Sequence, residues 1–232
     1  MLLLFDIDGT LLVGAAGAHR DAIYEALRVV HGVIEPDRRG TQVAGRTDAE
    51  IVRALLLTAG VSAERIDARA DDVRIAACEA YARLCPPDLS GCVVPGMAAL
   101  LARLAEREQA ILSLVTGNYE PIARRKLAAA GIGGLFARGH GGFGSDHESR
   151  AELPAIARRR ATGADGEPWP RARTLLIGDT PRDIACARAD GVRVIATATG
   201  PFEAAELTAA DAVARDAGEL GALLDELLAS AA

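Results

Sequence analysis

The first residues of the chain place an apolar run directly before two carboxylates. Leu2 to Phe5 continue without a polar break into Asp6, and Asp8 follows before Gly9. A short apolar run without alternation is typical of a β-strand buried on both faces, as in a parallel sheet. Because open α/β sheets bind ligands at the carboxyl ends of their strands, the pattern predicts that this strand delivers Asp6 and Asp8 to a site.

The two carboxylates have more than one interpretation. Close carboxylates repel each other and favour a hard divalent cation such as Mg²⁺, beside which a carboxylate can also attack phosphorus. Alternatively, Asp6 and Asp8 are only the polar end of a strand that turns at Gly9. An EF-hand loop starting at Asp6 does not fit, because Leu11 and Gly17 would stand where calcium binding needs Gly and Glu.

Composition and charge limit the classes of partner. The 232 residues fit one large domain or a domain with an insert, and a net charge of −6 with dispersed Lys and Arg argues against nucleic-acid binding. No apolar run is long enough for a bilayer, and no signal-peptide pattern is present. We therefore expect a cytoplasmic monomer or homodimer that binds neither nucleic acid nor membrane.

A helical block follows the first predicted strand. From about His19 to Leu84 the signals are helical, and Thr47 with Glu50 forms a capping box ahead of a helix that Gly60 ends. This stretch contains no convincing buried strand. It is therefore predicted to be a separate helical unit.

Polar groups also end the later predicted strands. Further buried strands are expected at 111–115, 174–177 and 192–196. The first of these ends at Thr116 and the second is followed by Asp179, and each leads into a helix. This alternation predicts an α/β fold with a parallel, doubly wound sheet, in which Asp6, Thr116 and Asp179 converge in one crevice.

The junction GDTPRDI carries two carboxylates four residues apart, Asp179 and Asp183. Taken alone, the pattern also fits helix capping by Thr180 or Asp183, with Pro181 at the first helical position. When Asp6 and Asp8 are considered as well, helix capping and metal binding are compatible. Asp179 can hold a metal ion while Asp183 supports Asp179 from behind.

Together, FDIDGTL, the strand that ends in Thr116, and GDTPRDI resemble the haloacid dehalogenase-like (HAD) superfamily. Within it, the pattern is most similar to the phosphoglycolate phosphatase-like hydrolases. The resemblance implies a Rossmannoid parallel-sheet core formed by residues 1–13 and 93–232. It also implies that residues 14–92 form an inserted α-helical cap.

The resemblance further implies the roles of the site residues. Asp6 would attack phosphorus and become an aspartyl-phosphate, while Asp8 would protonate the leaving alcohol and later deprotonate the attacking water. Thr116 and the N–H of Gly117 would bind phosphoryl oxygens. The Mg²⁺ ligands and their support would come from four aspartates: Asp6, Asp8 (through its backbone carbonyl), Asp179 and Asp183.

The sequence departs from the family pattern at the active-site cation. Family members usually carry a Lys followed by Pro-x-Pro between the second and fourth motifs, and no such string exists here. Arg150 stands at about the right place to neutralise Asp6 and the phosphoryl group, although it could also be an ordinary exposed Arg. Lys126 is the alternative cation. Val13 and Gly14 replace the acidic pair seen in many relatives, which leaves the cap hinge and substrate contacts open.

Substrate recognition is expected in the cap stretch AGRTD, residues 44–48. Arg46 and Thr47 stand at a helix amino terminus, where backbone donors and a guanidinium suit an anionic group, although Thr47 is also the obvious N-cap. His19 lies near the place of a cap histidine in β-phosphoglucomutases of the superfamily, but we expect a solvated helix residue. Residues 139–144 match GxGxxG without a strong preceding strand and are predicted to be a loop.

The sequence thus predicts a Mg²⁺-dependent phosphatase that hydrolyses a small phosphorylated metabolite, phosphoglycolate-like or a sugar phosphate, through an aspartyl-phosphate. One alternative is a phosphomutase of the β-phosphoglucomutase type, which would need a cap base such as His19. Another is a catalytically silent module that binds a phosphorylated ligand. By resemblance, a 2-haloacid dehalogenase lacks the carboxylate at Asp8 and is disfavoured.

Overall fold

A parallel sheet with the strand order β3-β2-β1-β4-β5-β6 forms the centre of the molecule. The computed structural model describes residues 1–36, 43–162 and 166–230. The strands are β1 (Leu2–Phe5), β2 (Ile111–Thr116), β3 (Gly142–Phe143), β4 (Thr174–Gly178), β5 (Arg193–Thr197) and β6 (Ala212–Ala214). The predicted α/β fold is confirmed.

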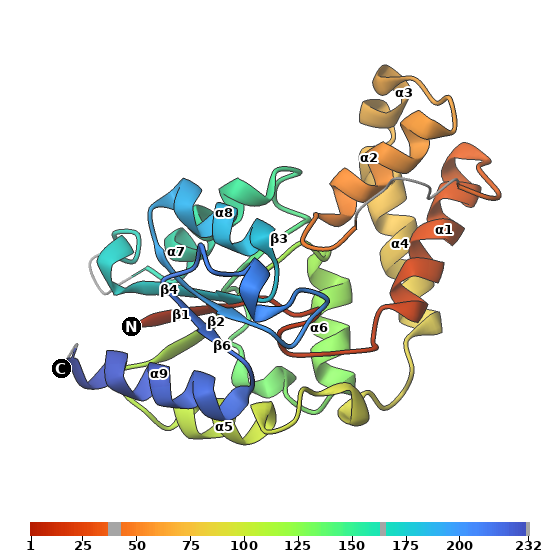
Figure 1. Ribbon diagram of the computed structural model, residues 1–232. Helices are drawn as coiled ribbons and strands as arrows, with labels where there is room; N and C mark the ends of the chain where they lie inside the picture. The colour runs from red at the N-terminus through yellow and green to blue at the C-terminus, as the bar shows by residue number, and fades with distance from the viewer. Residues whose placement is uncertain (37–42, 163–165, 231–232) are drawn as a thin grey trace.

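Helices cover both faces of the sheet (Figure 1). They are α5 (Met97–Ala105), α6 (Glu120–Ala129), α7 (Leu153–Arg160), α8 (Pro181–Asp190) and α9 (Ala217–Ser230). Leu3 and Phe5 belong to the apolar cluster that includes α5 and α9, whereas Leu2 and Leu4 belong to the cluster under α7 and α8. Alternate residues of β1 therefore enter different cores, which is why this strand is apolar without alternation.

A second unit of four helices lies beside the carboxyl edge of the sheet (Figure 1). It comprises α1 (Gly17–His31), α2 (Asp48–Thr58), α3 (Ala63–Ala68) and α4 (Ala70–Leu84), which we call the helical unit. The predicted capping box is present at α2, where the Glu50 N–H donates to Thr47 Oγ1 over 3.1 Å. The apolar core of this unit also takes in Tyr119 and Ile122, so the unit rests on α6.

The segments that enter and leave the helical unit pair with each other. The Val13 N–H donates to the Cys92 carbonyl over 2.8 Å, and the Val94 N–H donates to the Leu11 carbonyl over 3.0 Å. This antiparallel pairing brings the two ends of the insertion to one place. The division of core from cap at residues 13–14 and 92–93 stays a prediction.

Two strands at the edges of the sheet differ from the sequence interpretation. Gly142 and Phe143, inside the stretch expected to be a loop, pair with Val115 and Thr116 of β2. Residues 212–214 form β6, which had no predicted counterpart. Both are too short to give a periodic pattern. Among the described residues, no helix combines the length and apolar character needed to cross a membrane.

Candidate active site

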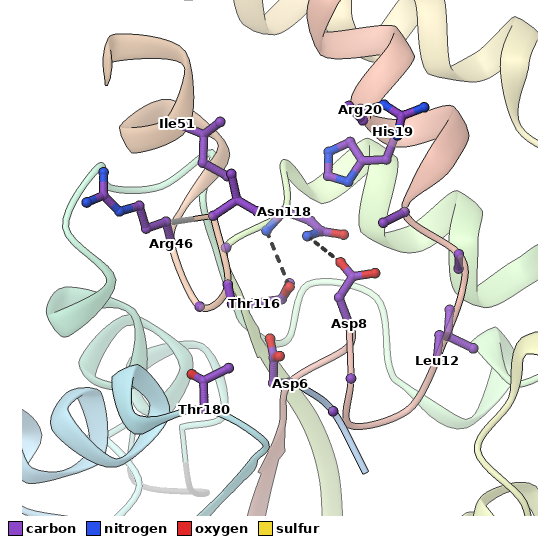
Figure 2. Close-up of a pocket in the computed structure, with 18 of the residues that line it drawn as sticks. Asp6, Asp8, Leu12, His19, Arg20, Arg46, Ile51, Thr116, Asn118 and Thr180 are labelled. Atoms are coloured by element: carbon purple, nitrogen blue, oxygen red, sulfur yellow. Dashed lines mark hydrogen bonds between the residues drawn. The ribbon is translucent and has the colours of Figure 1, made fainter. Parts of the chain in front are cut away.

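The polar residues at three strand ends meet as predicted. Asp6 follows β1, Thr116 ends β2 and Asp179 follows β4, and each is at most 4% exposed. Because β1 lies between β2 and β4, the three side chains come together at the sheet edge, where they line a cavity of about 590 Å³. Figure 2 shows Asp6 between Thr116 and Thr180 at the base of this cavity.

Asp6 is paired with the cation that the sequence favoured. Arg150 begins a short 3₁₀ turn before α7, and its Nη2 lies 2.9 Å from Asp6 Oδ1 and also contacts Asp183. Burial raises the pKa of Asp6 to about 7, with Arg150 acting in the opposite direction. Burial alone would lower the pKa of Arg150, but Asp183 and Asp6 hold it well above its usual value, so Arg150 stays cationic.

Asp183 braces the site from the start of α8. Its Oδ2 accepts hydrogen bonds from the Thr180 N–H at 3.0 Å and from Thr180 Oγ1 at 2.7 Å, and its Oδ1 faces Arg150. The capping interpretation of this junction is therefore correct. Since both oxygens of Asp183 are already paired, this residue is better suited to support a metal ligand than to bind the ion itself.

The cluster of Asp6, Asp179 and Asp183 fits a divalent cation that Asp6 and Asp179 bind and Asp183 supports. One oxygen from each lies within 4.8 Å of the others. Asp179 Oδ1 accepts from Thr10 Oγ1 over 3.0 Å, but its Oδ2 is buried without a partner among the described residues. Burial, followed by Asp6 and Asp183, raises the pKa of Asp179 to about 8. Carboxylates that destabilise each other in this way are suited to Mg²⁺, which prefers oxygen ligands.

Asp8 takes a different cation from the one at Asp6. Lys126 on α6 is fully buried, and its Nζ lies 2.8 Å from both Oδ1 and Oδ2 of Asp8. Asn118 Nδ2 donates to Asp8 Oδ2 over 2.9 Å. Burial would raise the pKa of Asp8, but Lys126 and its neighbours hold it below its usual value. Asp8 is therefore a carboxylate here, and it points toward the helical unit (Figure 2).

His19 corrects the expectation of a solvated helix residue. It is only 8% exposed, its Nδ1 lies 3.0 Å from Lys126 Nζ, and its Nε2 lies 3.0 Å from Asp48 Oδ2. Its ring also packs edge-on against Tyr81. The missed signal is the spacing of His19 with Ala22 and Ile23, which puts it on the buried face of α1.

Arg46 and Thr47, the two predicted substrate contacts in the loop before α2, lie in different surroundings. Arg46 lines the cavity, and its buried Nε has no partner among the described residues. The expectation for Thr47 is wrong, because Thr47 is fully buried, caps α2 and donates its hydroxyl to the Glu148 carbonyl over 2.6 Å.

Gly117 marks a close approach between the loop before α2 and the sheet. A Cβ at this position would lie 2.1 Å from the Arg46 carbonyl oxygen, so a larger residue would push the loop away. The Gly117 carbonyl accepts a hydrogen bond from the Asp48 N–H over 2.8 Å. Gly117 lines the same cavity as Thr116, as its predicted role requires.

Curated relatives share most of the length of the chain. A phosphoglycolate phosphatase from Rhodospirillum rubrum is 30% identical over 85% of this chain and 79% of its own length. A probable phosphatase, IndB, from Dickeya dadantii is 28% identical over 90% of this chain and 86% of its own. These matches agree with the branch predicted from the motifs.

The fold also recurs in solved structures. CbbY from Rhodobacter sphaeroides in complex with phosphate superimposes with a TM-score of 0.65 at 22% identity, covering 95% of this chain and 96% of that one. The family model for haloacid dehalogenase-like hydrolases matches residues 3–188, a span that runs from β1 into α8 and includes each predicted site residue. With the acidic strand ends, the buried cation and the inserted helices in place, the chain belongs to the haloacid dehalogenase-like hydrolases.

Proposed function

We propose that this protein is a Mg²⁺-dependent phosphatase that hydrolyses a small phosphate monoester through an aspartyl-phosphate on Asp6. The observation that carries the proposal is the ion pair of Asp6 with Arg150, 2.9 Å apart at the floor of a cavity that Thr116 and Asp179 also line. The names of the relatives, a phosphoglycolate phosphatase and a probable phosphatase, support the same chemistry.

The first step is an attack by a carboxylate oxygen of Asp6 on phosphorus, which breaks the bond to the leaving alcohol. Arg150 lies where it can neutralise the charge of Asp6 and of the phosphoryl oxygens. Thr116 Oγ1 accepts from the Asn118 N–H over 3.3 Å, so its own hydrogen is left to donate to a phosphoryl oxygen. The Gly117 N–H is the second donor.

The second step hydrolyses the aspartyl-phosphate and regenerates Asp6. Asp8 must take up a proton before the first step, in which it protonates the leaving alcohol as a carboxylic acid. In the second step the resulting carboxylate takes a proton from the attacking water, so Asp8 returns to its protonated form and protons balance over the cycle. Asp6, Asp179 and the Asp8 carbonyl would hold Mg²⁺, with Asp183 in support. A bound Mg²⁺ ion supplies charge neutralisation for phosphoryl transfer.

The cavity favours a small ester with a second anionic group. Its volume of about 590 Å³ suits a small metabolite rather than a polymer. Arg46 lines it from the loop before α2, and the buried Nε of Arg46 has no partner among the described residues. A guanidinium there would pair with the carboxylate of phosphoglycolate, and it would donate hydrogen bonds to the hydroxyls of a sugar phosphate.

The test is phosphate release by the purified protein from a panel of small phosphate monoesters. The panel contains phosphoglycolate, sugar phosphates and 4-nitrophenyl phosphate, each with Mg²⁺ and with a chelator. We expect release with Mg²⁺ and loss of release with chelator. No release from any ester by folded, Mg²⁺-loaded protein contradicts the proposal and leaves the phosphomutase or the silent phospho-ligand binder.

The phosphomutase alternative is disfavoured by the contacts of His19. A cap base must present a free ring nitrogen to the substrate, but Nδ1 of His19 faces Lys126 and Nε2 faces Asp48. We expect no interconversion of sugar phosphate isomers under conditions in which phosphate is released. Isomerisation of a sugar phosphate without phosphate release would favour the phosphomutase over the phosphatase.

A further inference from the structure

A line of buried polar side chains extends from Asp8 into the helical unit. Lys126 Nζ lies 2.8 Å from both oxygens of Asp8 and 3.0 Å from Nδ1 of His19. His19 Nε2 lies 3.0 Å from Asp48 Oδ2. We call Lys126, His19 and Asp48 the polar chain. The mechanism derived above gives it no task.

The hydrogens of the polar chain can be placed from its chemistry. The ammonium of Lys126 has three hydrogens and no acceptor, so it donates to the two oxygens of Asp8 and to His19 Nδ1. His19 Nδ1 therefore accepts, and Nε2 carries the hydrogen that is donated to Asp48. Each polar group is paired, and Lys126, which is fully buried, has no access to solvent.

Burial of the Lys126 ammonium lowers the stability of the folded protein. Removing an ammonium from water costs several kcal/mol, which hydrogen bonds and an opposite charge only partly offset. An apolar side chain at position 126 would avoid this cost, since the adjacent α6 residues Ile122, Ala123 and Leu127 are all buried apolar residues. The polar chain is therefore a candidate for a role in the reaction.

The polar chain crosses between the two parts of the molecule. Asp8 and Lys126 belong to the α/β core, whereas His19 and Asp48 lie on α1 and α2. Asp48 is itself tied to the core, because its Oδ2 accepts from the Tyr119 N–H over 2.7 Å. A displacement of the helical unit would separate His19 from Lys126 and leave Asp8 with its core partners alone.

We propose that Lys126, His19 and Asp48 are positioning residues that hold Asp8 in the orientation from which it accepts the proton of the water attacking the aspartyl-phosphate. This inference rests on the proposed function. The helical unit thereby contributes to the hydrolytic step without touching phosphorus.

The test separates formation of the aspartyl-phosphate from its hydrolysis. With 4-nitrophenyl phosphate the leaving group departs without a proton, so a burst of 4-nitrophenolate measures formation and the later steady rate measures hydrolysis. The variants are Lys126→Met, His19→Leu and His19→Asn. Asn keeps an acceptor for Lys126 near the position of Nδ1. The matched control is Arg125→Met, which removes an exposed cation next to Lys126.

We expect Lys126→Met to give a burst of about one equivalent and a steady rate about 100-fold below wild type, the typical contribution of a general base. His19→Leu should show the same pattern with a smaller loss, His19→Asn should recover part of the rate, and Arg125→Met should match wild type. In an Asp8→Asn background, Lys126→Met should add little, because both changes remove the same function.

A merely structural polar chain would give different results. Folded Lys126→Met or His19→Leu protein that lacks a burst, or that loses formation and hydrolysis equally, overturns the inference. If Lys126→Met does not fold, the two His19 variants decide the question. Failure of the proposed function is distinguishable, because wild-type protein would then release neither 4-nitrophenolate nor phosphate.

Discussion

The two carboxylates of the first motif are held by different parts of the molecule. Asp6 pairs with Arg150, which in turn contacts Asp183, so its surroundings come from the α/β core alone. Asp8 pairs with Lys126, whose next partner is His19 of the helical unit. The α/β core alone therefore holds Asp6, the proposed nucleophile, whereas Asp8, the proposed acid–base residue, is placed jointly by the core and the helical unit.

The chain geometry explains how neighbouring aspartates reach different surroundings. The Asp6 N–H donates to the Ile177 carbonyl over 2.9 Å, which continues the pairing of β1 with β4. Asp8 lies beyond the strand, before the turn at Gly9, whose φ of 95° favours glycine. A Cβ at Gly9 would lie 2.1 Å from Asp179 Oδ2, so the turn must also stay free of a side chain.

The largest effect is expected on the core side. Arg150→Met should lower turnover about 10³-fold, because it leaves the charge of Asp6 and of the phosphoryl group without its cation. Arg150→Lys should recover part of this loss, and Arg159→Met removes an exposed cation of α7 as the control. Steady-state rates of phosphate release measure the difference. Near wild-type turnover in folded Arg150→Met protein would show that another group neutralises Asp6.

The contacts of the helical unit with the core are expected to affect stability. Asp48→Ala leaves the Tyr119 N–H and His19 Nε2 without their acceptor and should lower the free energy of unfolding by about 2–4 kcal/mol. Asp48→Asn keeps a carbonyl oxygen and should lose less. Asp21→Ala, at an exposed position of α1, is the control. Denaturant titration measures these values, and equal stability of the Asp48→Ala and control proteins would argue against the joint placement of Asp8.

The proposed substrate contact in the loop before α2 should act on KM. Arg46→Ala is expected to raise KM for phosphoglycolate about tenfold with little change in kcat, because a charge-assisted contact to a non-reacting group is removed. For 4-nitrophenyl phosphate, which has no second anionic group, KM should change much less. Arg28→Ala, an exposed cation of α1, serves as the control. An equal change for both esters would assign Arg46 to the phosphoryl group instead.

The smallest effect concerns pH and stability without metal. The pKa of Asp6 is raised from 3.8 to about 7 and that of Asp179 from 3.8 to about 8. Between pH 3.8 and these raised values, the folded protein therefore binds more protons than the unfolded chain. In chelator, stability should therefore fall as the pH rises from about 4 to 8. The pKa of Asp8 is lowered, so its contribution is lost only as the solution becomes more acidic than the usual range of an aspartate.

Melting temperatures at pH 5 and pH 8 check this expectation. Mg²⁺ should raise the melting temperature more at pH 8, because it replaces the protons on Asp6 and Asp179. Asp6→Asn should show a weaker pH dependence in chelator than wild type. If the melting temperature of Asp6→Asn protein depended on pH as strongly as that of wild type, carboxylates other than Asp6 would be responsible for the pH dependence.

The core side of the site could be predicted from the sequence because its signals are local. Asp6, Thr116 and Asp179 each follow an apolar run, and parallel strands end at one edge, so their convergence follows from the fold class. The position of Arg150 between the second and fourth motifs predicts it as the active-site cation. Such inferences need no knowledge of how distant helices pack.

The helical side could not be predicted to the same extent. The pairing of Lys126 with Asp8 and His19 joins residues 118 and 107 positions apart in the sequence. It depends on how α1 and α6 pack, and no local pattern reports this contact. The stretch around Thr47 shows a second limit of prediction from the sequence. The same residue types fit an anion site and a helix cap, and only the contact with the Glu148 carbonyl distinguishes them.

In the proposed mechanism, Asp6 carries the phosphoryl group during turnover. The direct measurement is mass spectrometry of peptides from protein that is quenched in acid while it turns over a phosphate ester with Mg²⁺. We expect a phosphoryl group on the peptide that contains Asp6, more of it in Lys126→Met protein, and none in Asp6→Asn. Undiminished turnover by Asp6→Asn, or a phosphoryl group found only on another residue, would contradict it.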